Sequence, residues 1–269
     1  MIDLKFGLFW SGAPLSYLRY LTFKTLRHYH PDSEIELYVS DDYVKDGFSW
    51  HCEKQDFLYE GENKDYIDEL KELDVKIIKT DQFSNYPPNF SSDFFRWWWL
   101  KNNSGFYLDT DQIILKSFSD LPLDYELIYS CYQARSCGIY APVGCIGANR
   151  PHIVDFTYDI MHKFYDKNNY NSLGPFMFIY VLNMKPWGNI INMSSNCFYP
   201  IPESYLVQDI YKGKLDLLKG KMGSGNEVYS CHWFGGHPES QNFNNKYTEE
   251  FAKTSKDSIS VFLRHNDLI

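Results

Sequence analysis

The sequence lacks long apolar runs and closely spaced cysteine pairs. No stretch approaches the ~18 apolar residues that a membrane-spanning helix needs. The six cysteines form no Cys-x-x-Cys pair and no zinc-type Cys/His spacing. The N-terminus enters an apolar pattern without the basic and apolar regions of a secretory signal, so we expect no disulfide framework. We therefore expect a cytoplasmic protein, from a bacterial cytosol or the cytosol of a virus-infected host.

Positive charge is also scarce. The 26 Lys and Arg residues are outnumbered by 35 Asp and Glu residues, and the formal net charge is −9. Nonspecific nucleic-acid binding depends on Lys and Arg contacts with phosphates, so this class is not favoured. An anionic ligand would need a local cation in such a field, and a bound metal could supply it.

The order of the predicted elements indicates an α/β fold. A strand at 4–10, a helix at 15–30 and a strand at 34–40 form a β-α-β unit, which builds a parallel sheet. Further strands are predicted at 75–79, 106–111, 113–115, 126–131, 144–148 and 227–233, and helices at 91–102, 151–165 and 174–184. We see no repeat or linker in the 269 residues, so we expect one continuous domain.

The segment from Gly105 to Asp111 carries the strongest chemical signal. Strand alternation would send the carboxylates of Asp109 and Asp111 to the same side. Two adjacent carboxylates repel each other, and a divalent cation removes that conflict. Oxygen ligands suit Mg²⁺ or Mn²⁺, whose sites commonly also take substrate phosphates. The alternative is a polar strand end with two solvated aspartates.

A second polar pair lies just upstream. Asp93 and Arg96 are three residues apart and share one face of the predicted helix. The carboxylate can accept hydrogen bonds from sugar hydroxyls, and the guanidinium can hold hydroxyl or phosphate oxygens. The alternative is a surface ion pair of little energetic weight.

These motifs occur in a recognisable order. Ser92-Asp93-x-x-Arg96, then Leu100, then Gly105-x-Tyr107-x-Asp109-x-Asp111, resembles the sugar-binding region containing the Asp-x-Asp motif. Glycosyltransferase family 32, the yeast-type initiating mannosyltransferases and the large clostridial glucosylating toxins share that region. The resemblance implies a GT-A-like fold, in which a Rossmann-type nucleotide-sugar-binding half (1–120) carries an appended acceptor-binding half (121–269).

The resemblance also implies roles for individual residues. Asp111 would ligate the metal, Asp109 would support it and contact the ribose, and Asp93 and Arg96 would contact the donor sugar or ribose. The candidate catalytic residues are Asp109, Asp111 and Arg96. The candidate donor-binding residues are Phe9, Trp10, Asp93, Arg96, Tyr107, Asp109, Gly174, Pro175 and Lys221, with Phe9 and Trp10 near a uracil-type base.

Weaker matches lie downstream. Gly144–Asn149 resembles the segment behind the sugar pocket, and Gly174-Pro175 resembles a Gly-Pro step at a helix start. His232 would complete a metal site with Asp109 and Asp111, with His237 as the alternative. The stretch 219–225 is either a lid whose lysine meets the pyrophosphate or a plain surface loop.

The sequence therefore predicts a metal-dependent hexosyl- or pentosyltransferase that uses Mn²⁺ or Mg²⁺ and a UDP-sugar, with retention of configuration. The acceptor would be a glycan, lipid, protein or modified DNA base. Three alternatives remain at this point. They are a nucleotidyltransferase, a non-catalytic nucleotide-sugar-binding module, and a phage-type glycosyltransferase acting on hydroxylated DNA bases.

Overall fold

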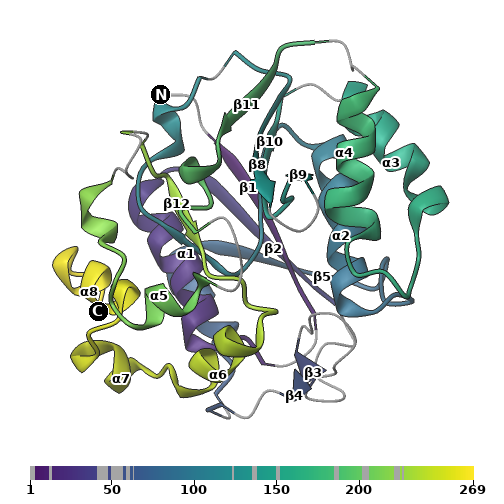
Figure 1. Ribbon diagram of the computed structural model, residues 1–269. Coiled ribbons are helices and arrows are strands. Elements are labelled where there is room, and N and C mark those ends of the chain that lie inside the picture. Colours follow the sequence, from purple (N-terminus) through teal and green to yellow (C-terminus); the bar gives the residue numbers. More distant parts are fainter. Residues whose placement is uncertain are drawn as a thin grey trace.

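The computed structural model describes residues 4–11, 14–40, 48–49, 57–58, 61–62, 64–122, 124–134, 138–149, 152–184, 188–201, 206–220, 225 and 227–269. An eight-stranded sheet forms its centre, with the order β11-β8-β10-β6-β1-β2-β5 and with β9 paired to β8 (Figure 1). Four neighbouring strands are parallel: β5 (Val75–Thr80), β2 (Glu34–Ser40), β1 (Lys5–Trp10) and β6 (Gly105–Leu108).

The other half of the sheet mixes directions. Strand β10 (Cys145–Ala148) runs antiparallel to β6 and to β8 (Leu127–Ala134). Strand β11 (Ile190–Ser194) is parallel to β8, and β9 (Gly138–Tyr140) is antiparallel to it. Two small sheets complete the strands: β7 (Gln112–Ile114) with β12 (Ser230–His232), and β3 (Phe48–Ser49) with β4 (Phe57–Leu58). This mostly parallel topology confirms the predicted α/β, GT-A-like fold class.

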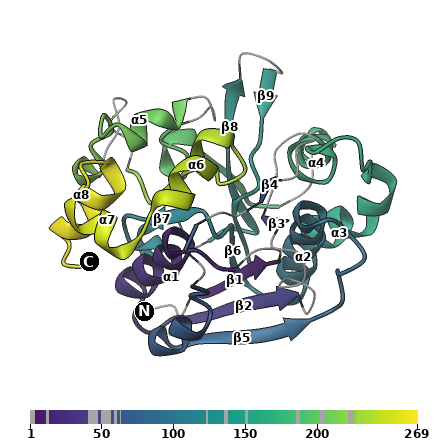
Figure 2. The same ribbon diagram turned by 90° about the horizontal axis from the view of Figure 1, so that it is seen from below.

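Helices cover both faces of the sheet (Figures 1 and 2). One side carries α1 (Tyr17–Tyr29) and the C-terminal helices α5 (Gln208–Tyr211), α6 (Pro238–Lys246), α7 (Glu249–Thr254) and α8 (Ser258–His265). The other side carries α2 (Pro88–Asn102), α3 (His152–Phe164) and α4 (Met177–Asn183). Short helical turns connect these elements: η1 (Asp68–Leu73), η2 (Phe118–Asp120), η3 (Ser172–Phe176), η4 (Ser195–Cys197) and η6 (Leu217–Lys219).

Alternation along β1 divides the core in two. Phe6, Leu8 and Trp10 join the apolar cluster on the α1 side, and Phe9 joins the cluster around α2. Helix α2 packs directly on β1 at Gly7, where a Cβ atom would lie 2.3 Å from the Trp99 ring. A glycine is therefore required for α2 to pack this closely on the sheet.

The structure corrects three predicted boundaries. Helix α2 begins at Pro88 rather than at the predicted serine caps, because proline is well suited to the first turn of a helix. The predicted strand at 106–111 ends at Leu108, and the following strand β7 pairs with β12 in a separate sheet. The predicted helix at 174–184 is interrupted at Gly174, whose φ of −91° and ψ of −113° are not helical.

The three C-terminal helices α6, α7 and α8 were not predicted. Side chains at their N-caps, His237, Thr248 and Asp257, accept hydrogen bonds from backbone N–H groups of the first turn. Among the described residues, no helix combines the length and the apolar character needed to cross a membrane.

Candidate active site at the Asp109–Asp111 turn

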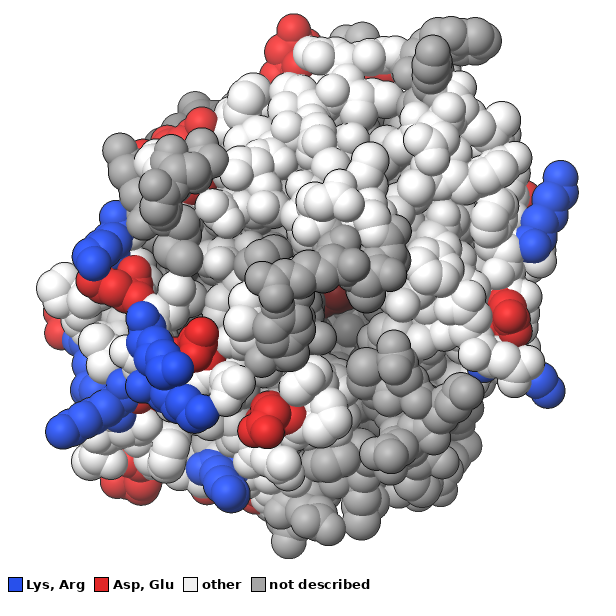
Figure 3. Space-filling model, viewed as in Figure 1, with Lys and Arg blue, Asp and Glu red and all other residues white. Residues whose placement is uncertain are grey.

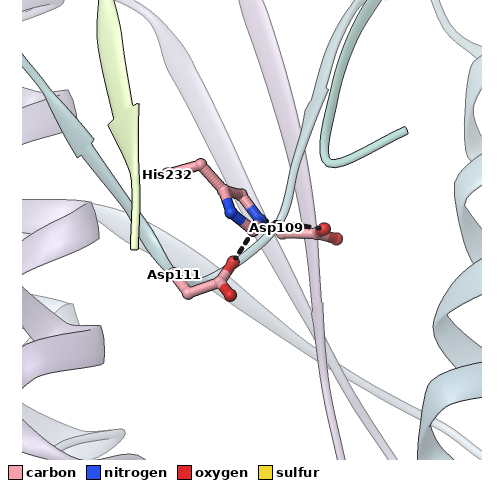
Figure 4. Close-up of side chains that lie close together, drawn as sticks. All are labelled: Asp109, Asp111 and His232. Atoms are coloured by element: carbon pink, nitrogen blue, oxygen red, sulfur yellow. Dashed lines mark ion pairs between the residues drawn. The ribbon is translucent and has the colours of Figure 1, made fainter. Parts of the chain in front are cut away.

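The turn between β6 and β7 brings three potential metal ligands together. Asp109 directly follows β6, Asp111 directly precedes β7, and His232 ends the neighbouring strand β12. One ligand atom from each of the three residues lies within 4.8 Å of the others. The His232 Nε2 atom is 3.2 Å from Asp111 Oδ1 and 3.8 Å from Asp109 Oδ2 (Figure 4). The pairing of β7 with β12 causes this convergence, because it fixes His232 opposite Gln112.

The turn that follows β12 orients the side chains of Asp111 and His232. Phe234 has a φ of 51°, a left-handed conformation that is uncommon for a bulky residue. This turn directs the Gly235 N–H to Asp111 Oδ2 at 2.6 Å and the Phe234 N–H to His232 Nδ1 at 3.2 Å. The Nε2 atom of His232 therefore faces the two carboxylates.

The charged side chains of the cluster shift the pKa values of His232, Asp109 and Asp111. Burial lowers the pKa of His232, but the carboxylates of Asp111 and Asp109 outweigh this effect and raise that pKa to about 9. Burial acts to raise the pKa of Asp109, but Arg96 and His232 outweigh it and hold the pKa well below its usual value. The pKa of Asp111 is also lowered, because His232 outweighs burial. The two carboxylates therefore favour a proton on the Nε2 atom of His232, which faces them.

The donor set fits a divalent cation. Oδ1 of Asp111 is buried and accepts no well-aligned hydrogen bond, and its near contact is the ion pair with His232 Nε2 at 3.2 Å. A metal ion would complete its coordination, and Mg²⁺ and Mn²⁺ favour carboxylate oxygens. Ligation by His232 Nε2 would require its proton to move to Nδ1, at the expense of the bond from Phe234 N–H.

Gly144 keeps the space beside these ligands open. A Cβ atom at this position would lie 2.5 Å from Asp109 Oδ2 and 3.1 Å from His232 Nε2. Its carbonyl also accepts hydrogen bonds from the Asp109 N–H at 2.8 Å and from Gln112 Nε2 at 3.2 Å. In the sequence, Gly144 is only the first residue of the segment that resembles the one behind the sugar pocket.

Helix α2 contributes a second charged group. The Arg96 guanidinium donates to Asp93 Oδ1, and its Nη2 atom donates to Asp109 Oδ1 at 3.1 Å. The Tyr107 hydroxyl donates to the same Asp109 oxygen at 2.6 Å, and the guanidinium lies over the Tyr107 ring at 4.6 Å. The Arg96 side chain is only 4% exposed, so this is not the surface ion pair that the sequence left open.

Asp93 is unusual among these carboxylates. Burial raises its pKa to about 6, although Arg96 acts against the shift. Gly174 lies beside it, because a Cβ atom there would be 3.6 Å from Asp93 Oδ1. The neighbouring Pro175 is also buried, in the π-helical turn η3. Gly174 and Pro175 thus precede helix α4 rather than forming its first turn, and they approach the site from the α4 side.

The other predicted residues that the structure describes are two buried aromatic residues and a capping histidine. Phe9 is 2% exposed and stacks on Phe95 at 5.1 Å, and Trp10 is 1% exposed with the Arg19 guanidinium 4.5 Å from its ring. Neither ring has an open face in this structure, so both are core residues here. His237 caps α6 by accepting from the Glu239 N–H, and it is outside the three-ligand group. Lys221 lies outside the described residues.

The space-filling view shows one face of the molecule. Near the middle of the face in Figure 3, an acidic side chain is visible at the bottom of a hollow. The surface over α3 and α4 is largely uncharged, whereas charged side chains of both signs gather over the C-terminal helices (Figure 3). The side chain of Asp109 is 26% exposed, and those of Asp111 and His232 are 11% and 10% exposed. The ligand cluster is thus mostly enclosed, with Asp109 its most accessible member.

Comparison with known structures gave several glycosyltransferases of low similarity. PaToxG glycosyltransferase is 22% identical over 68% of this chain and 70% of its own, with a TM-score of 0.49. The glycosyltransferase GlyE in Streptococcus pneumoniae TIGR4 is 12% identical, over 99% of this chain and 60% of its own, with a TM-score of 0.47. The galactosyltransferase LgtC, in complex with donor and acceptor sugar analogues, is 16% identical over 92% and 99%, with a TM-score of 0.45. No curated protein matches the chain.

The family comparison is the informative one. Residues 19–128 match the family model described as "Glycosyltransferase sugar-binding region containing DXD motif". The match covers less than half of the chain, but it includes α1, α2, β6 and the Asp109–Asp111 turn. It confirms the resemblance that the motifs suggested and the prediction of a glycosyltransferase. Residues 19–128 are thus similar to the glycosyltransferase sugar-binding region that contains the DXD motif.

Proposed function

We propose that the protein is a metal-dependent glycosyltransferase that transfers a monosaccharide from a nucleotide-diphosphate sugar, a UDP-sugar, to an acceptor hydroxyl. The convergence of Asp109, Asp111 and His232 carries this proposal, because it joins the DXD turn to a ligand from the far end of the chain. The buried Oδ1 of Asp111, which accepts no well-aligned hydrogen bond, supports a divalent cation, Mn²⁺ or Mg²⁺, at this point.

Asp109, Asp111 and His232 would hold this cation. When bound, it would neutralise the negative charge that grows on the departing nucleoside diphosphate. Arg96 and Asp93 would bind hydroxyl groups of the donor sugar or ribose from helix α2. Tyr107 fixes the Asp109 carboxylate by its hydrogen bond, so that the second carboxylate oxygen remains available to the cation.

The other predicted donor-binding residues would act around the same cluster. Gly174 and Pro175 would line the donor pocket next to Asp93, and Lys221 would meet the pyrophosphate. The buried positions of Phe9 and Trp10 support a role in shaping the base pocket rather than stacking on the base. Residues 1–120 would form the nucleotide-sugar half and residues 121–269 the acceptor half. The acceptor class is a glycan, lipid, protein or modified DNA base.

We propose that transfer retains the anomeric configuration. Each described carboxylate of the cluster is engaged: Asp93 by Arg96, Asp109 by Arg96 and Tyr107, and Asp111 by Gly235. This supports a front-face displacement, in which the leaving phosphate assists the attacking hydroxyl, over a covalent enzyme intermediate. A product with inverted anomeric configuration, measured by proton NMR, would contradict it.

A donor-hydrolysis panel tests the reaction class. Protein with Mn²⁺ is incubated with UDP-glucose, UDP-galactose, UDP-N-acetylglucosamine, UDP-arabinose and GDP-mannose, and release of nucleoside diphosphate is measured. We expect release from one donor, lost with EDTA and in Asp111→Asn. Asp159→Asn is the matched control, because this aspartate lies exposed on α3.

The outcomes separate the alternatives. Donor binding without turnover, in the presence of metal and candidate acceptors, would favour a nucleotide-sugar-binding module. Neither binding nor turnover of any donor would refute the proposal for this donor class. Transfer to hydroxylated DNA bases would assign the phage-type activity, which the net charge of −9 does not favour.

A further inference from the structure

Helix α1 presents a row of buried polar side chains to the DXD segment. Arg19, Thr22 and Thr25 follow one another at three-residue spacing and therefore share one face of the helix. Arg19 Nη1 donates to Thr110 Oγ1 at 2.7 Å, and Thr22 Oγ1 donates to the Thr110 carbonyl at 2.7 Å. Thr25 Oγ1 accepts from the Ile114 N–H at 3.1 Å. We call these three residues the α1 seam.

The α1 seam forms hydrogen bonds with one edge of the segment 110–114, and strand β12 pairs with the other edge. Strand β7 pairs antiparallel with β12, and the Trp233 N–H donates to the Asp111 carbonyl at 3.0 Å. This segment is not part of the central sheet. Its position therefore depends on helix α1 and on β12, and the α1 side of that support consists of side chains.

Arg19 also reaches the turn that binds Asp111. Its guanidinium lies 4.5 Å from the Trp10 ring centroid and 5.2 Å from that of Trp233. A Cβ atom on Gly235 would be 2.5 Å from Arg19 Nη2, so the guanidinium packs directly against this glycine. The Gly235 N–H in turn donates to Asp111 Oδ2. Arg19 thus contacts Thr110, which precedes Asp111 in the chain, and Gly235, whose N–H binds the Asp111 carboxylate.

We propose that the α1 seam is the positioning device of the metal site. It fixes Thr110, the residue between the two carboxylates, through both its side chain and its carbonyl. The seam thereby sets the separation of Asp109 and Asp111 before a cation binds. Without the seam, the two carboxylates would repel each other and move apart. Bringing them back together would then cost free energy and weaken metal binding. This inference rests on the proposed function.

Thr22→Val tests the seam, since it removes one hydroxyl and changes neither the charge nor the size of a fully buried side chain. Thr157→Val in α3 is the matched control. Its hydroxyl is equally buried and also donates to a carbonyl, that of Ile153, at 2.7 Å. Thr22→Ser restores the donor. Mn²⁺ dissociation constants are measured on the full chain by calorimetry, and the free energy of unfolding is measured in urea.

We expect Thr22→Val to weaken Mn²⁺ binding by about 5-fold, the effect of one lost hydrogen bond. Thr157→Val should lose similar stability but keep the wild-type dissociation constant, and Thr22→Ser should recover most of the affinity. Arg19→Lys, which keeps the charge but not the planar fork, provides a second test if Thr22→Val does not fold. It should also weaken Mn²⁺ binding.

Two results would overturn the inference. If Thr22→Val and Arg19→Lys bind Mn²⁺ like the wild type, the seam has no positioning role, whereas the proposed metal site stands. If Thr157→Val weakens binding as much as Thr22→Val does, the effect is general destabilisation. A wild-type protein that binds no Mn²⁺ would instead refute the proposed metal site, and this inference with it.

Discussion

Gly144 is the residue at which the metal site can be blocked with the smallest change. In Gly144→Ala the new methyl group would lie 2.5 Å from Asp109 Oδ2 and would enter the space between Asp109 and His232. We expect Mn²⁺ affinity to fall by about 10- to 100-fold, the range found when groups that support metal ligands are changed. Calorimetric titration measures the loss, and circular dichroism checks that the variant is folded. A folded variant with wild-type affinity would place the cation elsewhere.

Arg96 joins the buried carboxylate of Asp93 to the partly buried carboxylate of Asp109, and its removal should lower the stability of the fold. In Arg96→Met, Asp93 and Asp109 lose their shared cationic partner. We expect a loss of about 3–5 kcal/mol in the free energy of unfolding, as for other broken buried pairs.

Urea denaturation measures this change, with Lys101→Met as the control. Lys101 pairs with Asp155 and Asp159 at the surface, where such pairs contribute about 1 kcal/mol or less. If the two substitutions lowered the free energy of unfolding equally, Arg96 would contribute no more to stability than a surface ion pair does.

His30 makes the fold sensitive to acid at a distance from the site. Burial, assisted by Arg27, lowers its pKa from 6.5 to about 4, and its Nε2 atom accepts from the Phe118 N–H at 3.2 Å. The folded state thus resists protonation that the unfolded chain accepts. The contribution to stability is complete above pH 6.5 and is lost as the pH falls towards 4, by roughly 3 kcal/mol.

Urea denaturation at pH 7, 5.5 and 4.5 follows this loss. His30→Gln retains an acceptor but does not titrate, so its stability should fall less over this range. The exposed His152 provides the control substitution, His152→Gln, which should follow the wild type. An unchanged pH profile in His30→Gln would assign the acid sensitivity to other groups.

At the scale of elements, the contact between β1 and α2 sets the distance from the sheet of Asp93 and Arg96, the proposed donor-binding residues of α2. Gly7→Ala would insert a methyl group 2.3 Å from the Trp99 ring and push α2 outward. We expect a loss of about 1–3 kcal/mol from overpacking. Because Asp93 and Arg96 belong to α2, the KM for the donor should rise as well.

A double-mutant cycle checks the cause. Trp99→Phe provides room for the methyl group, although it removes the hydrogen bond from Trp99 Nε1 to Glu36. The combined loss of stability in Gly7→Ala/Trp99→Phe should therefore be smaller than the sum of the two single losses. Strict additivity would mean that the methyl group is accommodated without moving α2.

For the whole molecule, metal binding should couple to folding, since the proposed ligands Asp109, Asp111 and His232 come from two distant parts of the chain. Saturating Mn²⁺ at about 100 times its dissociation constant would stabilise the native state by about 2.7 kcal/mol. For a chain of this size we expect the melting temperature to rise by several degrees. Differential scanning calorimetry with Mn²⁺ and with EDTA measures this, and Asp111→Asn should abolish the difference. A shift that persists in the variant would indicate binding at other carboxylates.

The sequence by itself determined the opening β-α-β unit, the strand at 75–79 and the DXD motif. These features are local, since apolar periodicity and short motifs depend on neighbouring residues. Strand β2 matches its predicted range of 34–40. The order of Asp93, Arg96, Tyr107, Asp109 and Asp111 likewise identified the sugar-binding region, which the family match over 19–128 confirms.

Only the tertiary structure decided how the site is closed. Alternation on one strand was the stated reason for Asp109 and Asp111 to lie together, yet the strand ends at Leu108 and a turn carries both. The approach of His232 depends on the pairing of β7 with β12, more than 110 residues apart in the chain. Such pairing is fixed by the packing of the whole molecule, because no local pattern specifies which distant strand an edge will meet. For the same reason, the contact of Arg19 with Thr110 appears only when α1 is folded against the turn.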